Sequence, residues 1–372
     1  MEKIRNILCP LVFCLFLLVM SALLLFLPDR DYSEVEKQYL AQAPDFSWDA
    51  VLDGSYQQGL EDWVEAQFPG RELFVGINAY WQLLQGRNVQ QDIYYAEDGY
   101  LINDPETLNW ENFDRNLEII RNFSASAGVP TGMIMVPSTG SMLVDKLPLG
   151  HGEYADDQLF RQAAEQLEGV EFADLRPALA AQTEQVFYRT DHHLTAAGNY
   201  TLYAAWRQEQ GKAVTPVTQY QVERFDGFCG TTWTGSGYWL TEPDTVELWD
   251  SGAEVTVTIT EAGEDTVVSD TMFFRSHLEE LDMYPVYLDG NHTLVEIENP
   301  NAPEGTILLV KDSYAHGFAP FLADHYQKVI LVDLRFYRAS VSELIAEKGV
   351  DEVLFLYGVN TLLTDTNLRW LF

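Results

Sequence analysis

The chain has 372 residues, and its 57 Asp and Glu outnumber its 22 Lys and Arg, which gives a formal net charge of −35. A field this negative repels nucleic acid and anionic lipid head groups, so we expect no nucleic-acid partner. Hydrophobic residues make up 47% of the chain, which is typical of a globular protein with a full core and excludes a disordered chain.

The N-terminal residues predict a membrane anchor. An uncharged apolar run from Ile7 to Leu27 is long enough to cross roughly 30 Å of hydrocarbon as a helix. Lys3 and Arg5 precede it, so we expect residues 1–6 to be a cytoplasmic stub and the bulk of the chain to lie outside the cell membrane. A cleaved signal peptide is the alternative. The run ends in "LLLFLPDRDYSE" without a small-x-small cleavage site, which favours an uncleaved signal anchor.

Residues 28–90 predict a helical lead-in. Apolar residues recur there at helical spacing, with a break at Pro69-Gly70. The run "DIYYAEDGYLI" that follows predicts a hairpin around Gly99. From residue 91 to residue 372 we expect one α/β domain.

Helices and strands are predicted to alternate in the first part of that domain. We expect helices over 112–127 and 156–168 and buried strands over 129–137 and 169–175. Such alternation is typical of a parallel sheet.

The residue pattern changes between about residues 225 and 297, where Gly, Thr and Trp separate short β-forming runs. We expect a β-rich insertion there. The segment 305–358 is then predicted to form a strand, a helix, a strand, a helix and a strand in turn. This is the pattern of a doubly wound sheet with helices on both faces.

Two strand ends carry the candidate chemistry. The extended run "QVFYRTD" ends at Asp191, and Thr195 is placed to cap the next helix, so Asp191-His192-His193 lies on the turn between them. The buried run "ILLV" leads into Ser313. A serine needs an imidazole to take its proton and a carboxylate to orient that imidazole, and one Asp-x-His turn can supply both.

These segments resemble the DHHW family of anchored Gram-positive proteins. The resemblance rests on "RTDHHLTAAGNY" and "KDSYAHGFAPFL", and also on "DGSYQQGLEDWVEAQFPGR", "IYYAEDGYLI" and "YLDGNHTLVEI". Leu194 stands where the family name predicts Trp, which puts packing or substrate contact in doubt more than chemistry. More remotely, the pattern is similar to SGNH-hydrolase-like proteins that O-acetylate alginate and related exopolysaccharides. This implies an SGNH-like, flavodoxin-like fold.

The resemblance implies roles for particular residues. Ser313 would be the nucleophile, His193 the base and Asp191 the group that orients the base, while His192 would lie outside this triad. His192 is a candidate for an oxyanion or substrate contact, as are the turn residues Gly290 and Asn291 and the polar residues His316 and Arg335, each of which also has an ordinary structural interpretation.

Two other interpretations of the DHH turn remain open. Asp and Thr at a strand-to-helix turn often serve only as caps. Asp-His-His can also ligate a metal ion, and one phosphoesterase family is named for this triplet, but that family needs further Asp motifs which are not found before Asp191. Outside the apolar run Cys229 is the only cysteine, so no disulfide or cysteine metal cluster is expected in the ectodomain. We expect no metal and no cofactor.

The sequence therefore predicts acyl transfer, most readily of acetyl, to or from a cell-envelope or exopolysaccharide carbohydrate through an acyl-serine intermediate. Water as acceptor would make the protein an esterase. Because acyl donors do not cross membranes unaided, the resemblance implies a membrane-embedded acyltransferase partner. The alternative is a non-catalytic envelope scaffold or glycan-binding protein with a relic site. In either case Trp233, Tyr238 and Trp239 could stack on sugars, or they could equally pack in the core.

Overall fold

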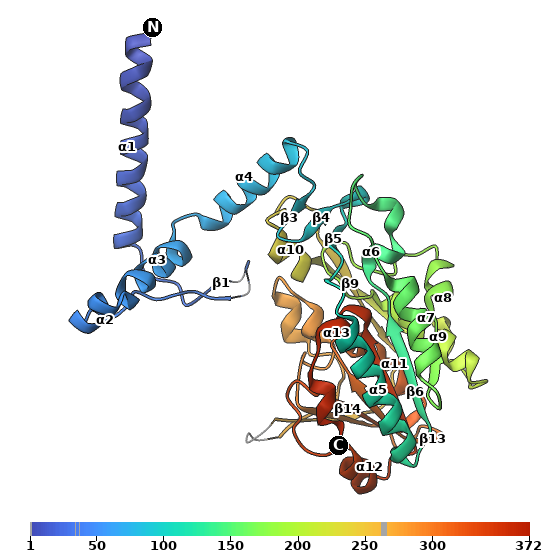
Figure 1. Cartoon of the computed structure of the whole chain (residues 1–372). Coiled ribbons are helices and arrows are strands. Elements are labelled where there is room, and N and C mark those ends of the chain that lie inside the picture. Colours follow the sequence, from blue (N-terminus) through green and yellow to red (C-terminus); the bar gives the residue numbers. More distant parts are fainter. Residues whose placement is uncertain (1, 34, 37, 262–265) are drawn as a thin grey trace. The chain divides into compact units, whose positions relative to one another are not determined.

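The computed structural model describes residues 2–33, 35–36, 38–261 and 266–372 (Figure 1). The chain divides into two compact units, each described here by itself. The first comprises Met1–Gln90 and Thr234–Trp239, and the second comprises Gln91–Trp233 and Leu240–Phe372.

The first unit is mainly helical. Within the described residues, α1 contains one segment, Asn6–Phe26, that is long and apolar enough to cross a membrane. The predicted break at Pro69-Gly70 separates α3 from α4, and Gly70 takes the left-handed backbone conformation with φ 71° there. The elements are α1 (Glu2–Phe26), β1 (Tyr32–Ser33), β2 (Gln38–Tyr39), α2 (Trp48–Asp53), α3 (Ser55–Gln67), α4 (Arg71–Leu84) and β3 (Val89–Gln90).

The second unit carries the alternating elements. Its strands are β4 (Ile93–Tyr95), β5 (Leu101–Asn103), β6 (Thr131–Val136), β7 (Glu171–Ala173), β8 (Gln221–Phe228), β9 (Asp244–Asp250), β10 (Thr256–Thr260), β11 (Val267–Ser269), β12 (Leu294–Glu298), β13 (Glu304–Lys311), β14 (Tyr326–Val332) and β15 (Glu352–Gly358). Its helices are α5 (Trp110–Ala127), α6 (Thr139–Met142), α7 (Asp156–Gln166), α8 (Arg176–Ala180), α9 (Ala196–Glu209), α11 (Ala315–Leu322), α12 (Val341–Lys348) and α13 (Val359–Thr364), while α10 (Thr231–Ser236) begins here and ends in the first unit. Short 3-10 turns are η1 (Glu97–Gly99), η2 (Val144–Lys146), η3 (Val217–Gln219), η4 (Arg275–Glu279), η5 (Tyr284–Val286) and η6 (Asn367–Leu371).

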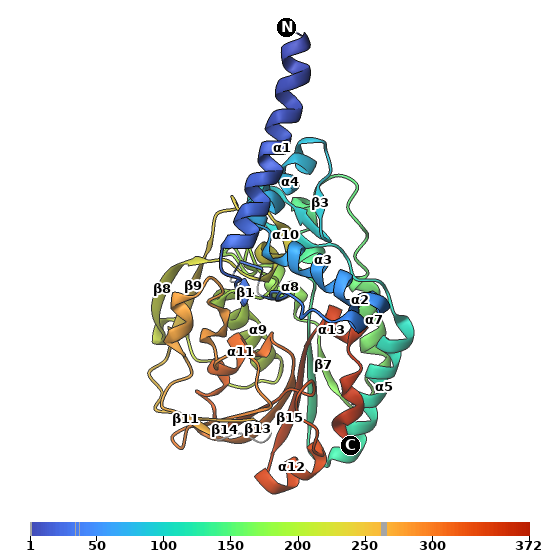
Figure 2. The same ribbon diagram turned by 90° about the vertical axis from the view of Figure 1, so that its left-hand side faces the viewer.

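The main sheet has eight strands in the order β11-β10-β12-β14-β13-β15-β6-β7. The five strands from β14 to β7 are parallel, and β12, β10 and β11 add to the β14 side as antiparallel strands. Figure 2 shows β11, β14, β13, β15 and β7 in this sequence across the sheet. The predicted α/β fold with a large, mostly parallel sheet is confirmed.

The flavodoxin-like strand order is not found. Numbered along the chain, the five parallel strands lie in the order 2-1-5-3-4, whereas a flavodoxin-like sheet has the order 2-1-3-4-5. The last strand, β15, lies between β6 and β13 because its apolar run "VLFLYG" is buried along its whole length, as a central strand of a sheet covered on both faces must be.

The β-rich region predicted between 225 and 297 is only partly separate. Strands β8 and β9 form their own antiparallel pair. Strands β10, β11 and β12 instead extend the main sheet, because β12 pairs with β14 from Leu294 to Glu298. The region is therefore in part a widening of the sheet.

Two apolar cores cover the two faces of the sheet. Along β13, Ile307 and Leu309 face a core that includes α9 and α11, while Leu308 and Val310 face a core that includes α5, α7, α12 and α13. Figure 2 shows α9 and α11 on one side of the sheet and α5 and α7 on the other. Alternate strand residues point to opposite faces, so a strand covered twice reads as a continuous apolar run.

Candidate active site

The turn after β13 holds Ser313 at the carboxyl edge of the sheet. The preceding residue, Asp312, is buried, and its carboxylate accepts hydrogen bonds from the backbone N–H of Tyr314 (3.0 Å) and of Gly358 (2.8 Å) and from the hydroxyl of Thr361 (2.6 Å). Burial raises the pKa of Asp312, and these three donors oppose the rise. The carboxylate ties this turn to the end of β15, which fixes the backbone under Ser313 while its side chain stays partly exposed.

The DHH turn is held by a short bridge between Phe187 and Leu194. Tyr188 N donates to the carbonyl of His193 (3.1 Å). The predicted cap is confirmed, since the Thr195 hydroxyl accepts from Gly198 N in the first turn of α9. Leu194 is buried among the core residues of this face, so the departure from the Trp of the family name lies in packing.

The two turns meet in a hydrogen-bonded chain of three side chains. His193 Nε2 lies 2.8 Å from Ser313 Oγ, and His193 Nδ1 lies 2.5 Å from Asp191 Oδ1. A carboxylate can only accept, so Nδ1 carries the proton and Nε2 is left to accept from the serine hydroxyl. This is the geometry in which an imidazole takes a serine proton.

The Asp191 carboxylate is buried and fully hydrogen-bonded. Its Oδ1 also accepts from His193 N (2.9 Å), and its Oδ2 accepts from Thr231 N (2.7 Å) and the Thr231 hydroxyl (2.8 Å). Burial acts to raise its pKa, but the neighbouring histidines and the hydrogen bonds prevail and hold the pKa of Asp191 well below its usual range. Asp191 is therefore ionised at neutral pH.

Two residues that hold Asp191 were missed from the sequence, namely Gly230 and Thr231. A Cβ on Gly230 would lie 2.3 Å from the Cβ of Asp191 and 2.4 Å from its Oδ2, so only glycine leaves room for the carboxylate. The sequence indicates only that the run "FCGTTW" belongs to the β-rich region. It gives no sign of a contact with Asp191, because the two segments are some 40 residues apart in the chain.

A stacked tyrosine fixes the plane of the imidazole. The Tyr284 ring lies 3.8 Å from that of His193, nearly parallel at 14°, and its hydroxyl donates to the carbonyl of Ser313 (3.1 Å). The Tyr314 ring lies 5.2 Å from His193, and its hydroxyl donates to the carbonyl of His192 (3.1 Å). Tyr284 thus contacts the His193 ring and the Ser313 backbone together. No local sequence signal singles it out.

The two histidines differ in their contacts. His192 Nδ1 lies 2.9 Å from the Thr231 hydroxyl, and its ring lies 3.9 Å from that of His193. Burial, together with the charge of His193, lowers the pKa of His192 to about 4, against the opposing effect of Asp191. His192 is therefore neutral at pH 7 beside the chain formed by Asp191, His193 and Ser313.

The donor set fits a metal ion poorly. One ligand atom each of Asp191, His192 and His193 lies within 4.8 Å of the others. However, both Asp191 oxygens accept hydrogen bonds, and the two His193 nitrogens face Asp191 and Ser313. Metal binding would have to break this network, so the arrangement suits a proton-transfer chain better than a metal centre.

Ser313 and His192 open into a cleft of about 250 Å³. Its lining is mostly polar. The other residues that line it are Leu101, Asn103, Glu106, Ser138, Thr139, Gly140, Thr232, Tyr314, Asn360, Thr361 and Thr364.

The remaining predicted contacts lie outside the lining of this cleft. His316 is buried against Lys311, whose Nζ lies 2.8 Å from His316 Nε2 and 3.0 Å from Asp333 Oδ2. Burial, with the charge of Lys311, holds the pKa of His316 well below its usual range. The Arg335 guanidinium binds Asp333 through Nε (2.9 Å) and Nη2 (2.5 Å), so this charge is already paired.

The loop of Gly290 and Asn291 is part of the same cluster. The Asn291 side-chain oxygen accepts from Arg335 Nη2 (2.7 Å), and Gly290, with φ 87°, forms a left-handed turn. The structure does not bring these two residues, His316 or Arg335 into the cleft, so it lends no support to their predicted oxyanion or substrate contacts.

The aromatic residues near 233–239 are packed against protein. Trp239 Nε1 donates to the carbonyl of Glu72 (2.7 Å), and the Tyr238 ring lies edge-on to Tyr80 at 5.6 Å within the first unit. Trp233 is buried in the second unit. These contacts favour the core interpretation over sugar stacking.

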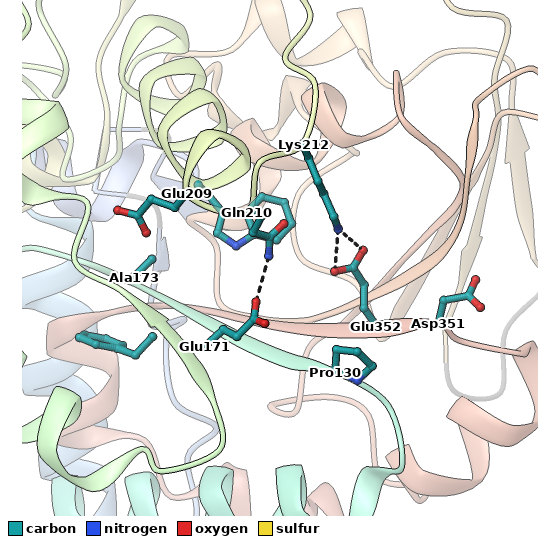
Figure 3. A pocket seen from close by; sticks show the side chains of 10 residues that line it. Pro130, Glu171, Ala173, Glu209, Gln210, Lys212, Asp351 and Glu352 are labelled. Carbon is teal, nitrogen blue, oxygen red and sulfur yellow. Dashed lines mark hydrogen bonds and ion pairs between the residues drawn. The ribbon is translucent and has the colours of Figure 1, made fainter.

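A second, larger groove lies at the opposite, amino edge of the sheet (Figure 3). It has a volume of about 670 Å³. Figure 3 shows Lys212 directed at Glu352 (2.7 Å) and Gln210 directed at Glu171 (3.4 Å). None of the described residues that line it is a serine, cysteine or histidine, so it offers no nucleophile with a base.

Residues 93–224 match the model of an "SGNH hydrolase-like domain, acetyltransferase AlgX". Residues 176–332 match the model of the DHHW family, described as "DHHW protein". The resemblance to DHHW proteins and the remoter one to SGNH-hydrolase-like proteins are both confirmed. No curated protein matches the chain.

Two kinds of solved structure share this fold. A DHHW family protein from Eubacterium siraeum is 21% identical, covering 76% of this chain and 95% of its own, with a TM-score of 0.65. Bacillus cereus PatB1 with a sulfonyl adduct is 19% identical, covering 75% of this chain and 97% of its own, with a TM-score of 0.64. PatB1 without the adduct gives a TM-score of 0.61 at 19% identity, covering 73% and 97%.

Proposed function

We propose that this protein transfers an acyl group, most readily acetyl, to or from a carbohydrate of the cell envelope or an exopolysaccharide, through an acyl-Ser313 intermediate. The observation that carries the proposal is the hydrogen-bonded chain from Asp191 through His193 to Ser313 at the mouth of a polar cleft. The similarity of residues 93–224 to a domain described as an acetyltransferase supports the acyl group.

The first half-reaction transfers the acyl group to the enzyme. His193 Nε2 takes the proton of Ser313 Oγ as the oxygen attacks the acyl carbonyl, and the Asp191 carboxylate stabilises the imidazolium that forms. The tetrahedral adduct collapses, the donor's alkoxide or thiolate leaves with the proton from Nε2, and the serine ester remains.

The second half-reaction transfers the acyl group from Ser313 to the acceptor by the same steps in reverse. A sugar hydroxyl in the cleft gives its proton to His193 Nε2 and attacks the serine ester, which breaks the bond to Oγ and returns the proton to Ser313. If water takes the place of the sugar, the same steps make the protein an esterase. Tyr284 keeps the imidazole in plane through both half-reactions, since its ring stacks on that of His193.

The N-terminal helix supports a place at the membrane. One segment of α1 has the length and composition to span a bilayer. We propose that residues 7–27 are an uncleaved signal anchor, that residues 1–6 stay in the cytoplasm and that the lead-in 28–90 joins the anchor to the extracytoplasmic α/β domain. A membrane-embedded acyltransferase would then supply the acyl group, because acyl donors do not cross bilayers unaided.

The test uses the full chain in detergent with p-nitrophenyl acetate as donor, and a sulfonyl fluoride as a serine-directed probe. We expect p-nitrophenol release and one covalent sulfonyl adduct, mapped by peptide mass spectrometry to Ser313, with both absent in Ser313→Ala. The Ser141→Ala variant is the control, because Ser141 donates its backbone N–H to a cap but is not among the residues lining the cleft. If the wild type shows neither p-nitrophenol release nor labelling, the proposal is wrong and a non-catalytic scaffold is favoured.

A further inference from the structure

We propose that the acceptor is an uncharged carbohydrate and that Glu106 is a specificity-determining residue that excludes anionic sugars from the cleft. This inference rests on the proposed acyl transfer and names the substrate class of the same site. It follows from the hydrogen-bonding groups and the charges that line the cleft.

The lining offers hydroxyl and amide groups rather than charges. Asn103 and Asn360 line the cleft, and among the residues that the structure describes neither side-chain amide has a hydrogen-bond partner; only their backbone carbonyls accept one. Amides both donate and accept, as do sugar hydroxyls, so such groups recognise neutral sugars directly.

A buried hydroxyl in the same cleft is left without a partner. Thr232 is only 2% exposed, and within the described parts of the chain no group hydrogen-bonds to its Oγ1. A buried polar atom without a partner costs free energy until something supplies the missing bond.

The charged residues of the cleft also favour an uncharged acceptor. No described Lys or Arg lines the cleft, and its one acidic residue, Glu106, is exposed and has no ion-pair partner among the described residues. Arg335, a predicted oxyanion or substrate contact, is bound to Asp333 and does not line the cleft. Sites that bind sugar carboxylates or phosphates usually present Arg or Lys.

A carboxylate on the acceptor would therefore meet Glu106 without a compensating cation. The net charge of −35 adds a repulsive field over the whole molecule. At the exposed rim the repulsion is screened by water and salt, so we expect Glu106 to account for a change of about fivefold, reduced at high ionic strength.

The test compares two acceptors that differ only in charge: glucose oligosaccharides and glucuronic acid oligosaccharides of equal length and linkage. The full chain in detergent is given p-nitrophenyl acetate, and the acetylated oligosaccharide is measured by mass spectrometry at low and high salt. We expect the neutral acceptor to be used at least about tenfold better at low salt. Where water is the better acceptor, the same ratio is measured for deacetylation of the two acetylated oligosaccharides.

The Glu106→Gln variant removes the charge and keeps the shape. We expect it to raise turnover of the uronate acceptor about fivefold while turnover of the neutral acceptor stays within about twofold. The matched control is Glu111→Gln, an exposed acid in the first turn of α5 that does not line the cleft, which should leave both unchanged.

Failure of this inference is distinct from failure of the proposed function. If turnover depends on Ser313 but both acceptors are used equally, or if Glu106→Gln leaves their ratio unchanged, the charge-selection inference is wrong and the acyl transfer stands. If Ser313→Ala retains turnover, both are wrong.

Discussion

The sheet of the second unit has a depression at each of its two edges, and the smaller one holds the reactive groups. The amino-edge groove has about 670 Å³ and the carboxyl-edge cleft about 250 Å³. Both contain acidic side chains. Loops that follow the carboxyl ends of parallel strands converge on one edge, so Ser313 and the DHH turn meet there, while the loops at the amino edge bring only strand beginnings together.

The carboxylates at the two edges also differ. Asp191 is buried, and its four hydrogen bonds leave one oxygen directed at the imidazole of His193. At the other edge Glu352 binds Lys212, and both side chains are partly exposed. Exposed ion pairs contribute little, so volume and acidic content alone do not identify a site.

The largest expected effect separates the two edges. The Ser313→Ala variant removes the nucleophile and should lower p-nitrophenyl acetate turnover by about 10³-fold or more, whereas Glu171→Gln in the amino-edge groove should leave it within about twofold. Steady-state rates of the two variants and the wild type decide this. A larger loss in Glu171→Gln than in Ser313→Ala would reverse the assignment of the two depressions.

The second largest effect is expected at the buried carboxylate of Asp191. The Asp191→Asn variant keeps the shape but favours the wrong imidazole tautomer, and kcat should fall by about 10³- to 10⁴-fold. Near-ultraviolet circular dichroism checks that the fold is kept, and the matched control is Asp289→Asn, whose carboxylate contacts His277 outside the cleft. If Asp191→Asn retains more than a tenth of the wild-type kcat, Asp191 is only a cap.

The glycine beside Asp191 gives a smaller effect on stability. In Gly230→Ala the new methyl group overlaps the Asp191 side chain, so we expect a loss of about 1–3 kcal/mol of unfolding free energy together with reduced kcat. The control is Gly132→Ala, where a Cβ would make ordinary contacts with Leu354 (3.4 Å) and Glu171 (3.6 Å). Urea denaturation compares the two, and equal losses would mean that Gly230 has no special fit to Asp191.

A pH series tests the role of His192. Its pKa is about 4 in the fold against 6.5 for an ordinary histidine, so the unfolded chain binds more protons between these values. The contribution of neutral His192 to the unfolding free energy is therefore fully present above pH 6.5 and is lost as the pH falls to 4. We expect this loss to be about 2 kcal/mol, because the side chain is partly exposed. The difference in denaturation midpoint between wild type and His192→Gln should change with pH over that window, and a constant difference would contradict the lowered pKa of His192.

The smallest effect is expected at the amino edge. The Lys212→Met variant breaks the pair with Glu352 and should cost about 1 kcal/mol or less in unfolding free energy, with turnover unchanged. Thermal unfolding and the p-nitrophenyl acetate assay measure both. A loss of turnover without a loss of stability would show that this groove takes part in function.

Much of the site was predictable because its chemistry is local. Asp191 and His193 lie two residues apart on one turn, and Ser313 lies just after an unmistakable buried strand. Gly230, Thr231 and Tyr284 were missed because each acts on that chain only from a distant segment, and a glycine, a threonine and a tyrosine carry no signal of such contacts. Conversely, His316 and Arg335 also come within five residues of the end of a buried strand, yet Lys311 and Asp333 bind them outside the cleft.

The sequence by itself determined the alternation of helices and strands, the apolar N-terminal helix and the residues able to form a proton-transfer chain, because periodicity, length and side-chain chemistry are local properties. Only the tertiary structure decided that β15 lies between β6 and β13, that β10–β12 widen the sheet, and that Gly230, Thr231 and Tyr284 contact Asp191 and His193. These depend on which surfaces pair across long separations, and strands of similar apolar composition do not encode their neighbours locally.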